Sequence, residues 1–152
     1  NTQNTESGGT TVADGISVST SYKLGDTVIT GITPGTGASS VLANISAGSG
    51  TVKVLKADGT ENTGAVGTGN KIAVYANGTL VKQYDVVIYG DINGDGKISV
   101  VDLVMMQKQI LGTSQLSGAY AAAADISRDG KVSVKDLVLL QKHIINAAQI
   151  EQ

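Results

Sequence analysis

The feature that most constrains this chain is an internal repeat close to its C-terminal end. Aligning DINGDGKISVVDLVMMQKQILG (91–112) with DISRDGKVSVKDLVLLQKHIIN (125–146) gives 13 identities in 22 positions, with Asp91 matched to Asp125. Self-similarity at a fixed spacing indicates a duplicated structural unit. Two copies are too few to stack into a helical solenoid, so we expect one small module built from two similar halves.

Each repeat begins with oxygen-bearing side chains at fixed positions. Counted from the first Asp, they fall at positions 1, 3, 5, 9 and 12, with Gly at position 6 and Lys at position 7. This is the spacing of a 12-residue calcium loop, in which alternate side chains supply oxygen ligands. The lysines would contribute only backbone carbonyls, and the serines at position 9 a bound water. The candidate ligands are Asp91, Asn93, Asp95, Lys97, Ser99 and Asp102, and in the second loop Asp125, Ser127, Asp129, Lys131, Ser133 and Asp136.

A competing interpretation is that these Asp-Gly clusters only mark hairpin turns. Against it, all six carboxylates between residues 90 and 150 occupy positions 1, 5 or 12 of the two loops. Three carboxylates held together without a cation would repel one another and raise one another's pKa. A divalent ion removes this repulsion. The chain has no Cys, so neither disulfides nor metal sites with thiolate ligands can stabilise a small module. We therefore expect two bound Ca²⁺ ions.

Both loops carry a β-branched residue at position 8, Ile98 in the first and Val132 in the second. This pair suits a short antiparallel contact between the loops, through which the two sites would support each other. The glycines at position 6, Gly96 and Gly130, would permit the sharp turn of each loop.

The helix predicted after each loop has two apolar stripes. The first stripe consists of Leu103, Met106 and Ile110, repeated as Leu137, Leu140 and Ile144. The second stripe consists of Val100, Val104 and Leu111, repeated as Val134, Val138 and Ile145. A module as small as this one cannot easily bury both, so the second stripe is expected to form an exposed interface. The alternative is that it packs on the other helix or on the preceding segment.

The segment from residue 16 to residue 89 is β-rich, with β-branched runs separated by Gly-containing turns. Asn77-Gly78 predicts a type I′ hairpin, Asp58-Gly59 predicts a second turn, and apolar spacing in 38–45 predicts one short helix. The predicted fold is thus two small modules, a sheet with one short helix followed by an all-α module with two loop-helix repeats. The expected division is a linker (1–15), the β-rich module (16–89), the all-α module (90–147) and a tail (148–152).

Several functional classes are disfavoured by composition. A net charge of -2 without a basic run gives no footprint for nucleic acid. No stretch approaches 18 apolar residues, so no membrane insertion is expected. No set of nucleophile, base and orienting group can be assembled, so we expect no enzyme activity. The polar start of the chain is typical of a linker and not of a signal peptide, which predicts that it begins within a longer protein.

A duplicated loop-helix with Asp at position 12 and Leu directly after it, as in Asp102-Leu103 and Asp136-Leu137, closely resembles the type I dockerin module of polysaccharide-degrading assemblies such as cellulosomes. The resemblance covers residue 90 to about residue 145. It implies calcium-dependent folding and binding to a cohesin module of a scaffoldin or a cell-surface protein, in a secreted bacterial complex at the cell surface. The segment 16–89 resembles the β-rich X modules that precede some dockerins.

The resemblance also implies which residues meet the partner, namely loop positions 10 and 11 and the exposed face of the following helix. Many members of the best-known group have Ser-Thr at positions 10 and 11, whereas this chain has Val-Val and Val-Lys. A more apolar recognition surface is therefore expected. The candidate partner-binding residues are Val100, Val101, Val104, Lys108, Leu111, Val134, Lys135, Val138, Lys142 and Ile145.

Two other functions stay open at this level. Met105 and Met106 would suit a calcium-responsive, EF-hand-like regulator that opens a Met-lined groove, although the first loop is preceded by a strand-like segment and not by a helix. The β-rich module would bind glycans if it offered aromatic platforms, but the chain has no Trp and only five Tyr. A spacer that supports the loop-helix module is the simpler expectation for it.

Overall fold

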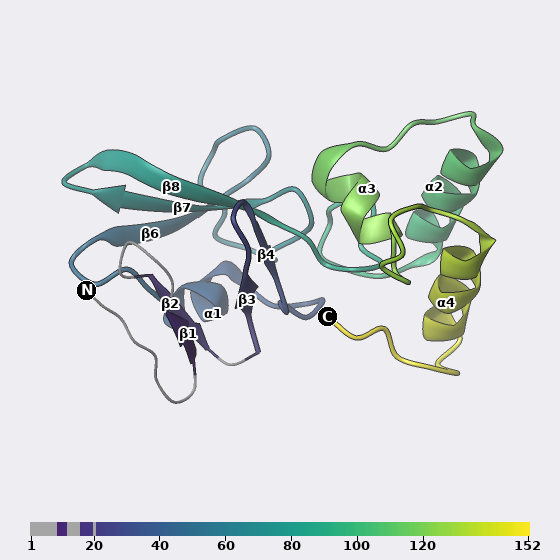
Figure 1. Cartoon of the computed structure of the whole chain (residues 1–152), viewed down its shortest axis with the longest axis horizontal. Coiled ribbons are helices and arrows are strands. Elements are labelled where there is room, and N and C mark those ends of the chain that lie inside the picture. Colours follow the sequence, from purple (N-terminus) through teal and green to yellow (C-terminus); the bar gives the residue numbers. More distant parts are fainter. Residues whose placement is uncertain (1–8, 12–15, 20) are drawn as a thin grey trace.

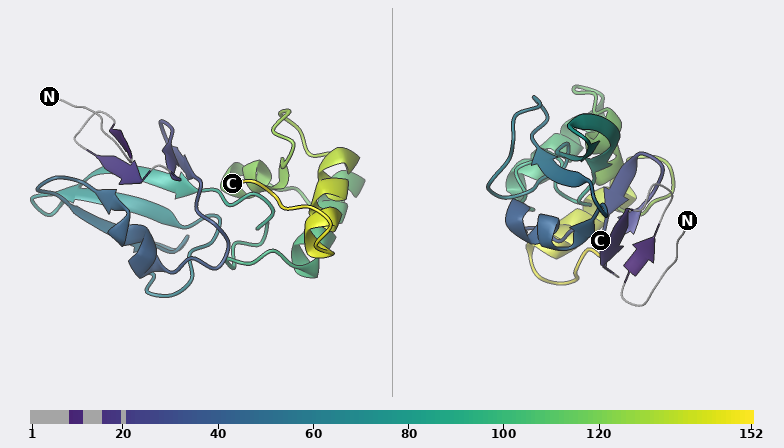
Figure 2. Two further views of the ribbon diagram at one scale, coloured as in Figure 1. Left: turned by 90° about the horizontal axis from the view of Figure 1, so that it is seen from below. Right: turned by 90° about the vertical axis from the view of Figure 1, so that its left-hand side faces the viewer.

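The structure is a computed structural model that describes residues 9–11, 16–19 and 21–152. Strands gather in one half of the elongated molecule and three helices in the other, and the views of Figures 1 and 2 agree on this division. A single connection after residue 86 leads from the last strand into the helical half.

The β-rich half contains two sheets. The smaller has the strand order β1-β2-β5, with bounds Gly9–Thr11, Ser17–Ser19 and Ile45–Ser46. The larger has the order β3-β4-β8-β7-β6, with bounds Lys23–Leu24, Val28–Thr30, Thr79–Val86, Lys71–Ala76 and Thr51–Leu55. Its strand pairs are antiparallel except β4 and β8, which run parallel. The predicted short helix is α1, Ala38–Ala43.

The predicted hairpin joins β7 to β8. Asn77 and Gly78 have φ angles of 54° and 80°. Positive φ at both central residues defines a type I′ turn, whose twist matches that of the flanking strands. The predicted turn at Asp58-Gly59 is also present, with the Lys56 N–H donating to the Thr60 carbonyl at 2.7 Å.

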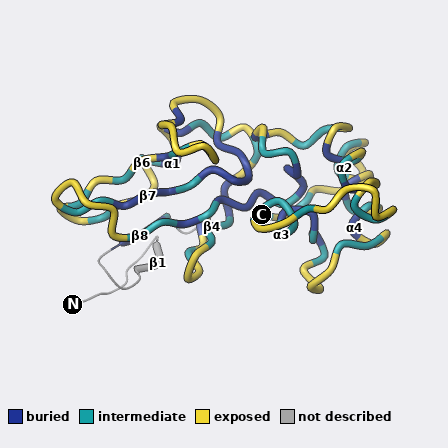
Figure 3. The backbone as a smooth tube through the Cα atoms, turned by 90° about the horizontal axis from the view of Figure 1, so that it is seen from above, coloured by how far each residue is buried: buried dark blue, intermediate teal, exposed yellow. Residues whose placement is uncertain are grey.

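The β-rich half has its own core, visible as the buried stretches of Figure 3. Ile29 and Ile72 from the larger sheet and Val41 from α1 are each at most 1% exposed. Alternation of buried and partly exposed positions along β2 and β4 places one face of each strand on this core. The predicted β-rich module with one short helix is therefore confirmed, although its strands form two sheets and not one.

Strand β1 lies within the segment that the sequence predicts to be a linker. It pairs antiparallel with β2, in the register Gly9 to Ser19 and Thr11 to Ser17. Two consecutive threonines favour the extended conformation, and their backbone pairs with the edge of β2. The remainder of the predicted linker, residues 1–8 and 12–15, lies outside the described residues.

The helical half contains α2 (Val100–Leu111), α3 (Gly118–Ala124) and α4 (Val134–Ile144). The sequence predicted α2 and α4 but not α3. The sequence signal for α3 is the run of four alanines at 121–124, because alanine has the highest intrinsic helix propensity. Because α3 leads into the second acidic loop, the second repeat is helix-loop-helix, whereas the first is entered directly from the sheet.

A second, smaller core holds the three helices together. Its buried members are Ile92, Met106, Ala124, Ile126 and Leu140. Met106 and Leu140 are the central residues of the first apolar stripe on α2 and α4, and both are fully buried. Among the described residues, no helix is long and apolar enough to cross a membrane.

Candidate functional site

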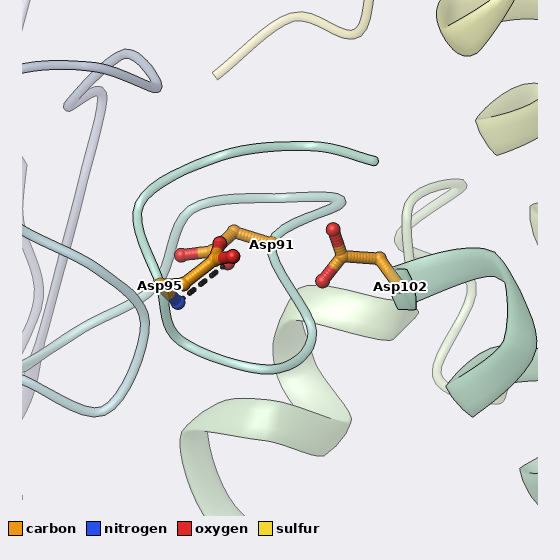
Figure 4. A group of neighbouring side chains, drawn as sticks. All are labelled: Asp91, Asp95 and Asp102. Carbon is orange, nitrogen blue, oxygen red and sulfur yellow. Dashed lines mark hydrogen bonds between the residues drawn. The ribbon is translucent and has the colours of Figure 1, made fainter. Parts of the chain in front are cut away.

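The two acidic loops bring their carboxylates together as the sequence predicts. In the first loop (91–102), oxygens of Asp91, Asp95 and Asp102 all lie within 4.8 Å of one another (Figure 4). In the second loop (125–136), Asp125, Asp129 and Asp136 meet the same limit. Each trio combines positions 1, 5 and 12 of its loop, so side chains from the two ends and the middle of the loop converge on one point.

Backbone N–H groups orient the carboxylate at position 1. Asp91 Oδ1 accepts hydrogen bonds from the N–H groups of Gly94 and Asp95, both at 3.1 Å, and Asp91 Oδ2 accepts one from Gly96 at 3.0 Å. Gly96 has a φ of 83°, and its counterpart Gly130 has a φ of 94°. Side chains are strained in this region, which explains why position 6 is Gly in both loops.

The second loop repeats this arrangement. Asp125 Oδ2 accepts a hydrogen bond from the Gly130 N–H at 2.9 Å, and Oδ1 accepts one from the Asp129 N–H at 3.2 Å. The predicted ligand at position 3, Ser127, points its hydroxyl toward Asp125 Oδ1 at 3.5 Å. In the first loop, the corresponding Asn93 side chain lies 3.4 Å from Asp95 Oδ2.

Aspartate at position 12 closes each loop and begins the next helix. Asp102 Oδ1 accepts from the Ile92 N–H at 2.8 Å, and Oδ2 accepts from the Ser99 N–H at 2.8 Å. Asp136 Oδ1 accepts from the Ser127 N–H at 2.7 Å, and Oδ2 accepts from the Ser133 N–H at 2.9 Å. The bonds to the serines are half of a capping box, because each serine is the N-cap residue of its helix. The side chain that would bind metal thus also fixes the helix start.

The first trio is more deeply buried than the second. Asp91 and Asp102 are both fully buried. The pKa of Asp91 is raised to about 6, mainly by burial and in smaller part by the negative charges of Asp102 and Asp95. Burial likewise raises the pKa of Asp102. At the second trio, the backbone N–H of Lys131 lowers the pKa of the exposed Asp129.

Among the described residues, no side-chain cation forms a salt bridge with either trio. In the part of the chain that the structure describes, the one salt bridge joins Lys71 to Asp85, within the larger sheet. Converging carboxylates, fixed by backbone donors and without a salt-bridge partner, are the chemistry of a site for a hard divalent cation.

This electrostatic arrangement predicts a pH effect. In calcium-free buffer, the helical half is expected to gain stability as the pH falls from 7 to about 5. The folded pKa of Asp91 lies near 6, against an ordinary value of 3.8. The folded state therefore binds a proton that the unfolded state lacks between these values, and the stabilisation disappears as the pH rises through 6. A pKa change of this size limits the effect to about 3 kcal/mol.

The helical circular dichroism signal of the calcium-free protein at pH 7, 6 and 5 would measure this effect, because a more stable helical half is folded in a larger fraction of the molecules. The variant Asp91→Asn serves as the control, since it keeps the shape of the side chain without titrating. A pH dependence of equal size in both proteins would contradict the role assigned to Asp91.

The second apolar stripe is exposed on both helices. On α2, Val100, Val104 and Leu111 are 59%, 41% and 76% exposed. On α4, Val134, Val138 and Ile145, the residue after its end, are 60%, 40% and 72% exposed. The alternative that this stripe packs inside the chain is therefore wrong. The remaining candidate contact residues, Val101, Lys108, Lys135 and Lys142, are exposed as well.

Two contacts of the helical half were not predicted from the sequence. The Gln152 side chain accepts a hydrogen bond from the Tyr89 N–H at 2.7 Å and donates one to the Tyr89 carbonyl at 2.9 Å. Arg128 lies over the Tyr89 ring, 4.0 Å from its centre. The tail 148–152 is thus tied to the start of the helical module.

The short antiparallel contact predicted between the two loops is not formed by backbone pairing. Ile98 and Val132 both pack on the second core, but the described residues show no backbone hydrogen bond between the two loops.

Two acidic loops, each followed by a helix, make up a tandem loop-helix module in the helical half. Residues 89–145 match the family model of the dockerin type I domain. A dockerin is a non-catalytic docking module. The comparison with curated proteins found no match.

Two similar solved structures are complexes of the third cohesin ScaC with the ScaB dockerin from Acetivibrio cellulolyticus, described as displaying a type I interaction. The complex mutated in the N-terminal helix has 25% identity and a TM-score of 0.40, and covers 43% of this chain and 92% of that chain. The complex mutated in the C-terminal helix has 26% identity and a TM-score of 0.39, and covers 43% and 96%.

Proposed function

We propose that the helical module binds two Ca²⁺ ions and docks its parent protein onto a cohesin module of a scaffoldin or a cell-surface protein. The complex would be extracellular and polysaccharide-degrading, and the chain itself would have no catalytic role. The observation that carries this proposal is the combination of two carboxylate trios with two exposed apolar stripes, one of each per repeat.

The residues of each loop fit calcium. Every side-chain donor is an oxygen, and calcium takes six to eight such donors at flexible geometry. The three carboxylates, the amide of Asn93 or the hydroxyl of Ser127, and a position-7 carbonyl would hold one ion in each loop. The ion would neutralise the trio and cross-link the loop. The chain's own Asp102 and Asp136 would then hold the starts of α2 and α4 in place.

The exposed stripes suit a protein partner. They place aliphatic side chains at loop position 10 and along α2 and α4, with Val101, Lys108, Lys135 and Lys142 beside them. Apolar centres with polar rims are typical of stable interfaces. The alternative of a Met-lined sensor groove is less well supported, because Met106 is fully buried in the second core.

We further propose that the β-rich module is a structural support. Two of the five tyrosines of the chain are buried and the other three are half-buried, which disfavours an aromatic platform for a sugar ring. Its largest exposed apolar residues are Leu80 and Val81, close to the β7–β8 hairpin.

A panel of purified cohesin modules tests the proposal. The intact chain is immobilised and exposed to each cohesin in millimolar calcium and again in excess chelator. Binding of at least one cohesin that is lost on chelation supports the proposed function. A panel drawn from bacterial scaffoldins and cell-surface proteins that gives no calcium-dependent binding would argue against it.

A further inference from the structure

We propose that the β-rich module forms a structural part of the first metal site, with Thr68 as a positioning residue for the ligand Asp91. The calcium affinity of the first loop then depends on the β-rich module, while that of the second loop does not. This inference rests on the proposed function, since it concerns how the same loops bind calcium.

A hydrogen bond from one module to the other carries the proposal. The Thr68 N–H donates to Asp91 Oδ2 at 2.9 Å. The same oxygen accepts from Gly96 within the loop, so the carboxylate is held from two sides. In the second loop, Asp125 Oδ2 accepts only from its own Gly130 among the described residues. Asp91 is fully buried, whereas Asp125 is half-buried.

Thr68 is itself firmly held. Its hydroxyl donates to the Ile88 carbonyl at 3.2 Å and accepts from the Ile88 N–H at 3.0 Å. The next residue, Gly69, donates its N–H to the Val86 carbonyl at 3.0 Å. Thr68 is 1% exposed. The donor that reaches Asp91 is therefore fixed to the strand segment that leads into the loop, and its position does not depend on the loop being closed.

The backbones of the two modules also lie in direct contact at this place. The Gly35 N–H donates to the Gly96 carbonyl at 2.9 Å. A Cβ atom on Gly67 would lie 2.1 Å from the Gly94 carbonyl oxygen, and one on Gly96 would lie 2.8 Å from the Val66 carbonyl oxygen. At the second loop, a Cβ on Gly130 would meet nothing within 4 Å. Among the described residues, only the first loop packs against a wall of β-rich backbone, formed by residues 66–69.

Hydrogen bonds from outside the ligand shell orient the ligands, and their loss typically costs about 10 to 100-fold in metal affinity. The wall at 66–69 is in place once the β-rich module has folded, before any ion binds. Folding of the β-rich module therefore already covers part of the entropy cost of ordering the first loop. The second loop must order itself. The coupling is reciprocal, so calcium in the first loop should also stabilise the β-rich module.

The variant Gly67→Ala tests this in the intact chain, because its methyl group would force the 66–69 wall away from Gly94. Gly64→Ala is the matched control. It lies in the same connection, and its added Cβ would have an ordinary contact, 3.7 Å from Asn62 Oδ1. Calcium is titrated into isotope-labelled protein, and the amide signals of Gly96 and Gly130 report the two loops separately. We expect the Gly96 midpoint to rise about 10-fold or more in Gly67→Ala, with Gly130 within twofold and Gly64→Ala unchanged.

A second pair of variants covers the case in which Gly67→Ala fails to fold. Thr68→Val removes both hydroxyl bonds to Ile88, and Thr68→Ser keeps them. Thr68→Val should raise the Gly96 midpoint alone, and Thr68→Ser should restore it. Equal shifts at both loops, or an unmoved Gly96 midpoint in Thr68→Val, would overturn the inference. Absence of calcium uptake by either loop of the unmodified chain would instead remove the proposed function, and the inference with it.

Discussion

Removing calcium from the intact chain is expected to abolish most of the helical signal while the β-rich module stays folded. Without the ion, each loop holds three converging carboxylates that form no salt bridge with a side-chain cation of the described residues. The helical core has five buried members, Ile92, Met106, Ala124, Ile126 and Leu140. A core of this size rarely outweighs the entropy of ordering even a small module. An ion present at 1,000 times its dissociation constant would add about 4 kcal/mol.

The measurement is far-ultraviolet circular dichroism with and without excess chelator, combined with proton exchange at individual amides. Helices α2 and α4 should lose protection, whereas β7 and β8, which border the larger core, should keep theirs. Chelator saturated beforehand with calcium is the control. A helical signal that survives chelation at neutral pH would show that packing alone holds the helices.

Replacing Val100 and Val134 together with Asp is expected to weaken cohesin binding at least about 100-fold. The two valines occupy matching positions at the starts of α2 and α4 and are 59% and 60% exposed. Burying two new charges in an apolar interface is costly, and the central residues of an interface carry most of its energy. The fold should survive, because an acidic residue in the first turn of a helix is favourable.

Val81→Asp is the matched control for this double variant. Val81 is also an exposed valine, at 54%, but it lies on β8 in the other half of the molecule. Surface plasmon resonance in saturating calcium would compare the variants, and the melting temperature would verify their folding. Unchanged affinity of the double variant, or an equal loss in Val81→Asp, would place the interface away from the two helices.

The helical module was largely predictable because its signals are local. Ligand spacing within one loop is a property of consecutive residues, so Asp91, Asp95 and Asp102 could be grouped before any tertiary contact was known. The separation of the two apolar stripes was equally local, since helical periodicity decides which residues share a face. The Asn77-Gly78 hairpin belongs to the same category, because its turn type follows from two adjacent residues.

The features that sequence reasoning missed depend on contacts between distant segments. Thr68 reaches Asp91 across 23 residues, and nothing in its neighbourhood resembles a metal-site motif. Gln152 binds Tyr89 across 63 residues, at the end of a segment that was predicted to be a tail. Helix α3 is different, because its alanine run is a local signal that lies outside the two repeats.

Calcium uptake by the intact chain tests the central claim most directly. Isothermal titration calorimetry of metal-free protein with calcium chloride at pH 7 should give a stoichiometry of two ions per chain, and Asp91→Asn combined with Asp125→Asn should remove both. Heat of dilution alone, with no saturable binding at either loop, would contradict the account.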